Sequence, residues 1–224
     1  MTSHQQWIPA DWTFRSDAVA ERFDNHVRES LPWYDLATFG TAHFVRCFLP
    51  SGGLVYDIGA STGNIGRAVA DVLATRDGSL IAIETAQEMA DLWNSPGTLV
   101  VADACDYEYE PFDVAVLFLT LMFIPVRKRR PLLDRLREFC RPGGAIIVVD
   151  KTPLPSGYLG SSIHRLTLAQ KQAAGISSQE IAEKELSLSG VQRPLDNELG
   201  DGWTEWLRVG EFAGFIYEGR AVGP

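Results

Sequence analysis

Carboxylates and glycines gather around a predicted strand, and they are the residues of this chain best suited to bind a polar ligand. Asp57 lies in the strand 54–58, and the turn after it contains Gly59, Ser61 and Gly63. Glycines allow a tight turn and let a ligand approach the backbone without a Cβ in the way. The start of the following helix offers unpaired amide donors. A strand–turn–helix junction needs glycine in any protein, but this pattern also fits an adenosine-type ligand.

The next two strands also end in acidic residues. The strand 79–83 ends at Glu84, 21 positions after Gly63, and the strand 98–102 ends at Asp103. A carboxylate at the tip of the second strand is placed to accept two hydrogen bonds from a ribose diol. Three carboxylates around one ligand repel a pyrophosphate and suit a cation. We therefore predict S-adenosylmethionine (SAM), which carries a sulfonium and an ammonium group, as the cofactor.

Alternating strand and helix patterns indicate the fold class. Strands are predicted at 54–58, 79–83, 98–102, 112–118 and 145–149, with helices at 63–75, 86–94 and 127–140. This alternation is typical of an α/β protein with a mostly parallel, doubly wound sheet that helices cover on both faces. The helix 127–140 begins with the basic run 127–130, which we interpret as a solvated helix start.

We predict a single domain, 1–224, because 224 residues suffice for one sizeable core. Residues 1–50 comprise an arm that docks on the domain (1–16) and two lid helices, one of which is 17–30. The cofactor-binding core is 51–150, followed by a helical cap and a final strand. In the cap, 151–212, we expect a helix pair with Ser177 as a cap, and another helix at 203–212; the final strand lies in 213–224.

Composition excludes several classes of protein. The net charge of −9 argues against a broad basic face for nucleic acid. The sequence has no apolar run long enough for a membrane span and no secretory signal, so we expect a cytoplasmic protein without a membrane partner. Cys47, Cys105 and Cys140 are isolated, which argues against a metal site and against a disulfide framework.

Several of these motifs resemble a known family. The chain is similar to the class I SAM-dependent methyltransferases, which have a Rossmann-like fold, and within them to the carboxy-S-adenosylmethionine (carboxy-SAM) synthases of tRNA wobble-uridine modification. The resemblance runs from about Phe23 to Phe215, and the matching segments are 30–34, 55–61, 81–84, 120–123, 142–145, 171–175, 180–181 and 213–215. The segments around Tyr34 and Lys171 are the most specific.

The resemblance implies roles for individual residues. Tyr34 would close over the cofactor, Gly59 and Ser61 would line its amino-acid end, Glu84 would hold the ribose, and Asp103 with Ala104 would border the adenine. It also implies a homodimer. Our predicted cofactor-binding set is Tyr34, Asp57, Gly59, Ala60, Ser61, Gly63, Glu84, Thr85, Asp103, Ala104 and Phe118.

The chain departs from the subfamily at two residues. Phe118 stands where the subfamily has an Asn, and Val209 stands where it has the Arg that holds the extra carboxylate, with Arg208 one step away. The chain also ends nine residues after Phe215. We therefore expect the C-terminal strands to be shortened and the sheet edge to be trimmed or completed by a partner chain.

Methyl transfer from a sulfonium depends on holding the acceptor in line and excluding water, with a general base only if the acceptor loses a proton. The candidates are Tyr34, Lys151, His164, Arg165 and Arg208, and we favour Tyr34, Lys151 and Arg208 as catalytic. Three hypotheses stay open. The chain is a methyltransferase for a small molecule or nucleic-acid base, a prephenate-dependent carboxy-SAM synthase or a relative that handles carboxy-SAM, or a non-catalytic cofactor-binding or dimerisation module.

Overall fold

A seven-stranded sheet forms the centre of the protein in a computed structural model, which describes residues 8–220. The strands are β1 (Leu54–Ile58), β2 (Ser79–Glu84), β3 (Thr98–Val101), β4 (Phe112–Phe118), β5 (Cys140–Lys151), β6 (Trp203–Val209) and β7 (Phe212–Glu218). Their order across the sheet is β3-β2-β1-β4-β5-β7-β6. Strands β1 to β5 pair in parallel, and β7 pairs antiparallel with both β5 and β6. The predicted α/β, mostly parallel sheet is confirmed.

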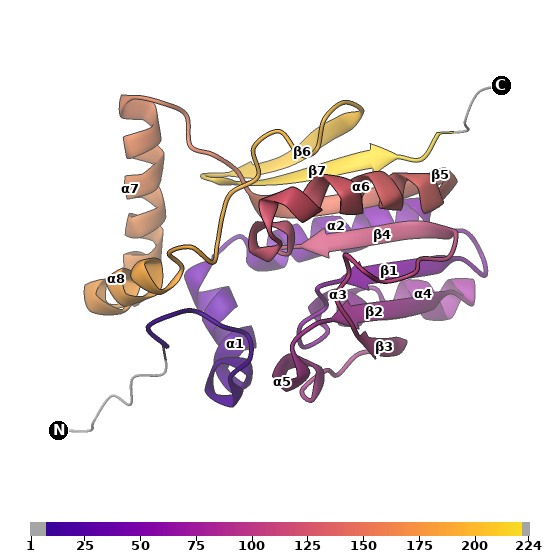
Figure 1. The fold of residues 1–224 in the computed structure, drawn as a ribbon, viewed down its shortest axis with the longest axis horizontal. Coiled ribbons are helices and arrows are strands. Elements are labelled where there is room, and N and C mark those ends of the chain that lie inside the picture. The colour runs from indigo at the N-terminus through magenta and orange to yellow at the C-terminus, as the bar shows by residue number, and fades with distance from the viewer. Residues whose placement is uncertain (1–7, 221–224) are drawn as a thin grey trace.

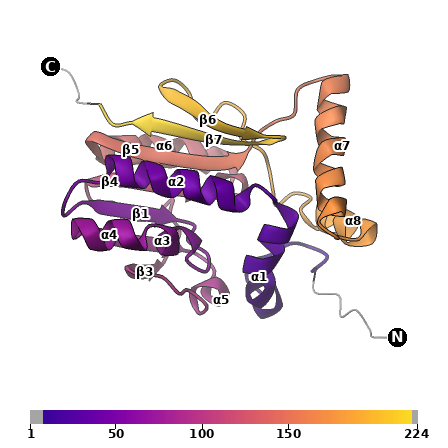
Figure 2. The same ribbon diagram turned by 180° about the vertical axis from the view of Figure 1, so that it is seen from behind.

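Helices cover both faces of this sheet (Figures 1 and 2). One face carries α2 (Tyr34–Phe48), α3 (Asn64–Ala68) and α4 (Ala70–Arg76), and the other carries α6 (Val126–Phe139). Strand β4 is buried along its whole length because alternate side chains enter two cores: Val116 packs on the α2 side and Leu117 on the α6 side. None of the helices in the described part of the chain is long and apolar enough to cross a membrane.

Two helices of the core differ from the sequence prediction. The predicted helix 63–75 is interrupted at Val69, which separates α3 from α4. The predicted helix 86–94 contains only the short α5 (Gln87–Ala90), and β3 follows after a loop that contains Pro96 and Gly97. Both differences concern where helices end, which side-chain periodicity determines only weakly.

The C-terminal segment corrects two expectations. Residues 203–212 are not a helix: β6 and β7 form a hairpin whose link is Gly210 and Glu211, with Gly210 at φ 60°. The sheet edge is therefore neither trimmed nor left for a partner chain, since both closing strands are present. Packing explains the outcome, because the Trp206 ring lies against Gly40 and Gly214, where a Cβ on either glycine would overlap it.

The cap and the N-terminal arm lie at one end of the molecule, beside α1 (Asp17–Ser30) (Figure 2). The cap helices are α7 (Tyr158–Ala173) and α8 (Ser178–Ser187), and the Ser177 hydroxyl accepts from the Glu180 amide, as predicted. In the arm, the Trp12 amide donates to the Ser187 carbonyl at 2.9 Å, and Trp12 is buried. The arm therefore contacts the cap at Trp12, whereas residues 1–7 of the predicted arm lie outside the described residues.

A buried arginine attaches the segment between α8 and β6 to α6. Arg129 is fully buried and forms an ion pair with Glu198 at 2.8 Å. Its guanidinium also donates to the carbonyls of Ile124, Arg193 and Pro194 at 2.9–3.0 Å. The expectation that the whole basic run 127–130 is solvated is therefore wrong at Arg129, because its side chain points into the protein and finds acceptors there.

This arrangement predicts a large cost for removing one partner. We expect Arg129→Met to lower the free energy of unfolding by about 3–5 kcal/mol, because Glu198 and the carbonyls would lose their donor inside the protein. The matched control is Arg130→Met, since Arg130 is exposed and should change stability by about 1 kcal/mol or less. Urea unfolding followed by circular dichroism measures both, and equal losses in the two variants would contradict this account.

Candidate functional site

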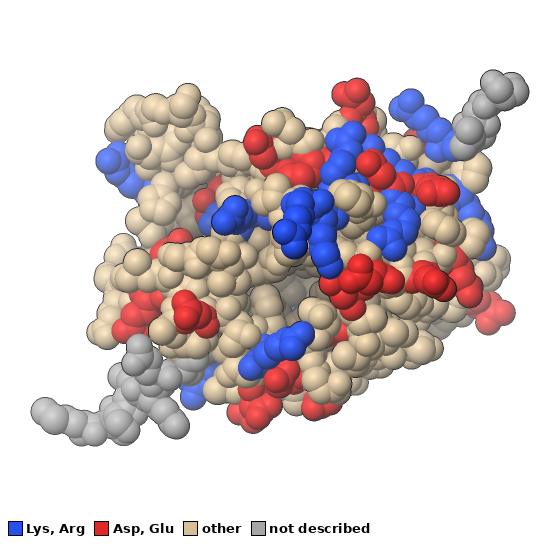
Figure 3. Space-filling model, in the orientation of Figure 1, with Lys and Arg blue, Asp and Glu red and all other residues tan. Residues whose placement is uncertain are grey.

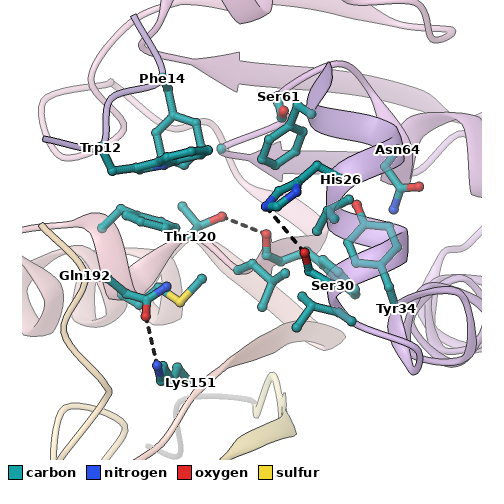
Figure 4. A pocket seen from close by; sticks show the side chains of 18 of the residues that line it. Trp12, Phe14, His26, Ser30, Tyr34, Ser61, Asn64, Thr120, Lys151 and Gln192 are labelled. Atoms are coloured by element: carbon teal, nitrogen blue, oxygen red, sulfur yellow. Dashed lines mark hydrogen bonds between the residues drawn. The ribbon is translucent and has the colours of Figure 1, made fainter. Parts of the chain in front are cut away.

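A cavity of about 250 Å³ opens beyond the carboxyl ends of β1, β2, β4 and β5. Strand order changes direction between β1 and β4, and ligands of open α/β sheets bind at such a switch point. The predicted site residues that line it are Tyr34, Asp57, Gly59, Ala60, Ser61, Glu84, Thr85, Phe118 and Lys151. Figure 4 shows that the arm, α1 and the strand ends all contribute side chains to its wall.

The glycine turn is closely packed against the end of β4. Gly59 has φ 74°, and a Cβ there would lie 2.6 Å from the Thr120 side chain. The Thr120 hydroxyl donates to the Ile58 carbonyl at 2.9 Å, which holds the ends of β1 and β4 together. Ser61 also has a positive φ, 49°, which is uncommon for a residue with a side chain. The loop is therefore held in a conformation that its contacts determine.

Glu84 anchors this loop. One carboxylate oxygen, Oε2, accepts from the Ser61 amide at 2.8 Å, and Oε1 accepts from the amides of Thr85 and Ala86 at 2.8 and 2.9 Å. A carboxylate offers about four acceptor sites, so three are used by the backbone. A ribose diol that donates two hydrogen bonds to Glu84 therefore requires one of these three amides to give up its bond.

Asp57 is a buried acid of the site, and although the Gly66 backbone amide hydrogen-bonds to its carboxylate, its Oδ2 atom lacks a partner among the described residues. Burial, reinforced by the nearby Glu84 carboxylate, raises the pKa of Asp57 to about 7. Asp57 and Glu84 together form an acidic floor that fits a cationic group. The ammonium and sulfonium of SAM supply such a group.

Aromatic side chains form the wall opposite the loop. The Tyr34 ring meets Phe118 edge-on, with ring centroids 5.3 Å apart, and the Arg28 guanidinium lies 5.2 Å from the Tyr34 ring centroid. Burial raises the pKa of Tyr34 well above its usual value, so its phenol stays neutral. Phe118, at the position of the subfamily's Asn, offers the cavity no hydrogen bond, only apolar surface.

The cap side of the cavity holds lysines from three elements. Lys151, at the end of β5, forms an ion pair with Glu211 at 3.2 Å and a hydrogen bond with Gln192 at 3.0 Å (Figure 4). Sequence reasoning missed Lys171 of α7 and Lys184 of α8, as well as His26, Trp12 and Phe14. Only the resemblance around Lys171 pointed to any of them.

Other predicted site residues do not line the cavity: Gly63, Asp103, Ala104, Arg208, His164 and Arg165. Asp103 forms an ion pair with Lys128 at 3.0 Å. Arg208 lies on β6, pairs with Glu205, and donates to the Thr152 hydroxyl at 3.1 Å. Its expected position on a helix is wrong, and its side chain is engaged outside the cavity.

Comparisons with known proteins agree with this geometry. Residues 55–144 match the methyltransferase domain family. The chain has the class I methyltransferase fold. The TehB-like SAM-dependent methyltransferase of Corynebacterium glutamicum matches with a TM-score of 0.53 at 14% identity, covering 91% of this chain and 100% of that one. Human N-acetylserotonin methyltransferase, solved with SAM, matches with a TM-score of 0.54 at 17% identity, covering 93% of this chain and 58% of that one.

Curated relatives are similar over almost the whole chain. The carboxy-SAM synthase of Staphylococcus epidermidis is 26% identical over 93% of this chain and 97% of its own length. That of Shewanella oneidensis is 27% identical over 92% of each chain. At the level of domain family and fold, these comparisons confirm the expected resemblance and the Rossmann-like fold. At the same level they confirm a SAM-dependent transferase with SAM as its cofactor.

The raised pKa of Asp57 predicts pH-dependent cofactor binding. Below about pH 7 the carboxyl is protonated, and a cation binds the carboxylate, so SAM affinity should fall about tenfold per pH unit as pH decreases from 7. Titration calorimetry between about pH 5.5 and 8 measures the SAM affinity of both wild type and the Asp57→Asn variant. The Asn variant should bind more weakly at pH 8 and show a flat profile; an unchanged slope would assign the proton elsewhere.

Proposed function

We propose that this protein transfers the methyl group of SAM to an acceptor bound between the glycine loop and the cap. The observation that carries the proposal is the buried Asp57 carboxylate at the acidic floor of the cavity, whose Oδ2 has no hydrogen-bond partner in the part of the chain that the structure describes. A buried, unpaired acceptor costs stability unless a ligand satisfies it. Domain family and fold support the same cofactor.

The chain's own residues would bind and shield the reactants. Asp57 would hold the cofactor's ammonium, Glu84 its ribose, and the Gly59–Thr62 backbone its amino-acid end. SAM supplies an electrophilic methyl group, which needs no covalent help from the protein. Tyr34 and Phe118 exclude water from that side, and rigid positioning is the main source of rate acceleration.

The cap side of the cavity is the proposed acceptor site. Its wall consists of Trp12, Phe14, His26, Lys171 and Lys184, which suits a small molecule or a single base rather than a duplex. On the face drawn in Figure 3, basic side chains over α6 are interspersed with acidic ones. Arg130 pairs with Asp134 and Arg141 with Asp113, so these charges are neutralised within the chain. A small-molecule acceptor is therefore favoured.

A second candidate function is that of a carboxy-SAM synthase-like enzyme. The curated relatives carry that name over more than nine-tenths of this chain. The cavity offers Lys151, Lys171 and Lys184 as cations for an extra carboxylate, whereas Arg208 lies outside it. The non-catalytic alternative loses the support that a shortened sheet would have provided, because the sheet is complete.

Two measurements test the proposal. We expect mass spectrometry of the small molecule released from the denatured protein to identify SAM or S-adenosylhomocysteine, and carboxy-SAM if the second candidate is right. In titration calorimetry, Glu84→Gln should weaken SAM binding about tenfold or more, since a charged hydrogen bond is worth about 1.5–3 kcal/mol. The control, Asp71→Asn, changes an exposed acid on α4. No bound ligand and no heat with SAM in wild type would overturn the proposal.

A homodimer is also part of the proposal. Helix α7 stands apart from the sheet, with only Gly160 buried (Figures 1 and 2). Its apolar side chains Tyr158, Leu159 and Leu166 are 80%, 61% and 50% exposed, so a second copy would cover apolar surface there. The cysteines in the described residues are free, which suits the reducing cytoplasm that we propose as its location.

The exposed face of α7 makes the dimer testable. We expect sedimentation velocity to show a dimer for wild type and a monomer for the double variant Leu159→Glu/Leu166→Glu, because buried charges without partners disrupt an apolar interface. The control is Leu92→Glu, since Leu92 is 43% exposed and lies beside α5, outside this face. A wild-type monomer at micromolar concentration would contradict the dimer.

A further inference from the structure

Lys184 differs from the other two lysines of the cavity in that it has no anionic partner within residues 8–220. Lys151 is paired with Glu211 at 3.2 Å, and Lys171 is paired with Glu185 at 2.8 Å. Among the described residues, Lys184 makes no hydrogen bond or ion pair through its amine, which lies against the ring of Trp12. Lys151 and Lys171 are thus each paired with a carboxylate, whereas Lys184 is not paired with any in the described part of the chain.

Burial and the neighbouring Lys171 disfavour a positive charge on the Lys184 amine. The arm contributes the Trp12 ring, which keeps water away but whose face attracts a cation. Helix α7 contributes Lys171, which repels a second positive charge. Helix α1 contributes His26. Burial and the two lysines lower the pKa of His26 to about 4, so its imidazole is neutral. The neighbouring Glu185 acts in the opposite direction, but its carboxylate is bound to Lys171. Burial is the largest effect and lowers the pKa of Lys184 to about 6.

We propose that Lys184 is the general base that removes the proton from the acceptor atom during methyl transfer. This assignment rests on the proposed function. The acceptor's O–H or N–H bond breaks, its electron pair forms the new bond to the methyl carbon, and the carbon–sulfur bond breaks with its electrons staying on sulfur. The proton passes to the Lys184 amine, which becomes an ammonium and later releases the proton to water.

Other titratable groups of the cavity are less suited to this step. A general base works best with a pKa close to the working pH, and His26 at about 4 is too weak a base. The Tyr34 phenol is held neutral, and a neutral phenol is a poor base. Asp57 faces the cofactor's end of the cavity, whereas Lys184 belongs to the cap wall. Lys151 and Lys171 are each engaged by a carboxylate, Glu211 and Glu185 respectively.

Trace acetylation tests the assignment without an acceptor. The chain has four lysines, at 128, 151, 171 and 184, so peptide mass spectrometry follows each amine separately. Acetic anhydride reacts with the neutral amine, so the labelling rate as a function of pH reports each pKa. We expect half-maximal labelling of Lys184 at about pH 6, and of Lys128 at a pH above the ordinary lysine range, because Asp103 and Asp106 raise the pKa of Lys128. Trp12→Ala should move the Lys184 midpoint upward by hydrating the amine.

The same labelling with saturating SAM separates the outcomes. Continued labelling of Lys184 at pH 7 supports the proposal, because the amine stays neutral and open on the acceptor side. An ordinary midpoint overturns it and favours a charged lysine that holds a substrate anion. Protection of Lys184 by SAM also overturns it, since the amine would then belong to the cofactor site.

Calorimetry with SAM distinguishes failure of this inference from failure of the proposed function. We expect Lys184→Gln to keep wild-type affinity for SAM, because Lys184 does not hold the cofactor. If wild type itself binds no SAM, the proposed function fails and the base assignment fails with it, whatever the labelling shows. If SAM binds and Lys184 labels as an ordinary lysine, only the base assignment fails.

Discussion

The carboxylate of Glu84 is the interaction on which the site depends. Its two oxygens accept from three backbone amides, one in the glycine loop after β1 and two directly after β2. Charge-assisted hydrogen bonds of this kind are stronger than neutral ones, so a single side chain fixes the loop relative to the second strand. Asp57 can then remain buried beside it, because the loop conformation is already determined. Burying the Asp57 carboxylate, whose Oδ2 has no partner among the described residues, is costly, and this cost makes the cavity attractive to a cation.

A second buried charge plays the corresponding part for the cap. Arg129 joins α6 to the carbonyls of residues 193 and 194 and to Glu198, so the segment that follows α8 cannot move away from the sheet. That segment includes Gln192, the hydrogen-bond partner of Lys151 at the cavity wall. Glu84 therefore positions one end of the cavity and Arg129 the other, and most hydrogen bonds of both side chains are made with backbone atoms.

Charge is divided across the cavity in the same way. The floor is acidic, with Asp57 and Glu84, and the cap wall contributes Lys151, Lys171 and Lys184. Two of these lysines are neutralised by Glu211 and Glu185, which leaves the amine of Lys184 as the group whose protonation state the surroundings decide. A cationic cofactor at one end and a proton acceptor at the other is a reasonable arrangement for methyl transfer to a protic acceptor.

The sequence by itself determined the parallel core and the cofactor loop. Buried strands, a glycine turn and acidic strand ends are local patterns, and the structure has β1, β2 and β4 where these patterns predicted them. Only tertiary structure decided that residues 203–209 are a strand. The reason is that Trp206 packs on Gly40 of α2, which is distant in the sequence, and on Gly214 of the neighbouring strand β7. It likewise decided that Arg129 is buried and that Lys184, not Arg208, reaches the cavity, since long side chains take their environment from segments distant in sequence.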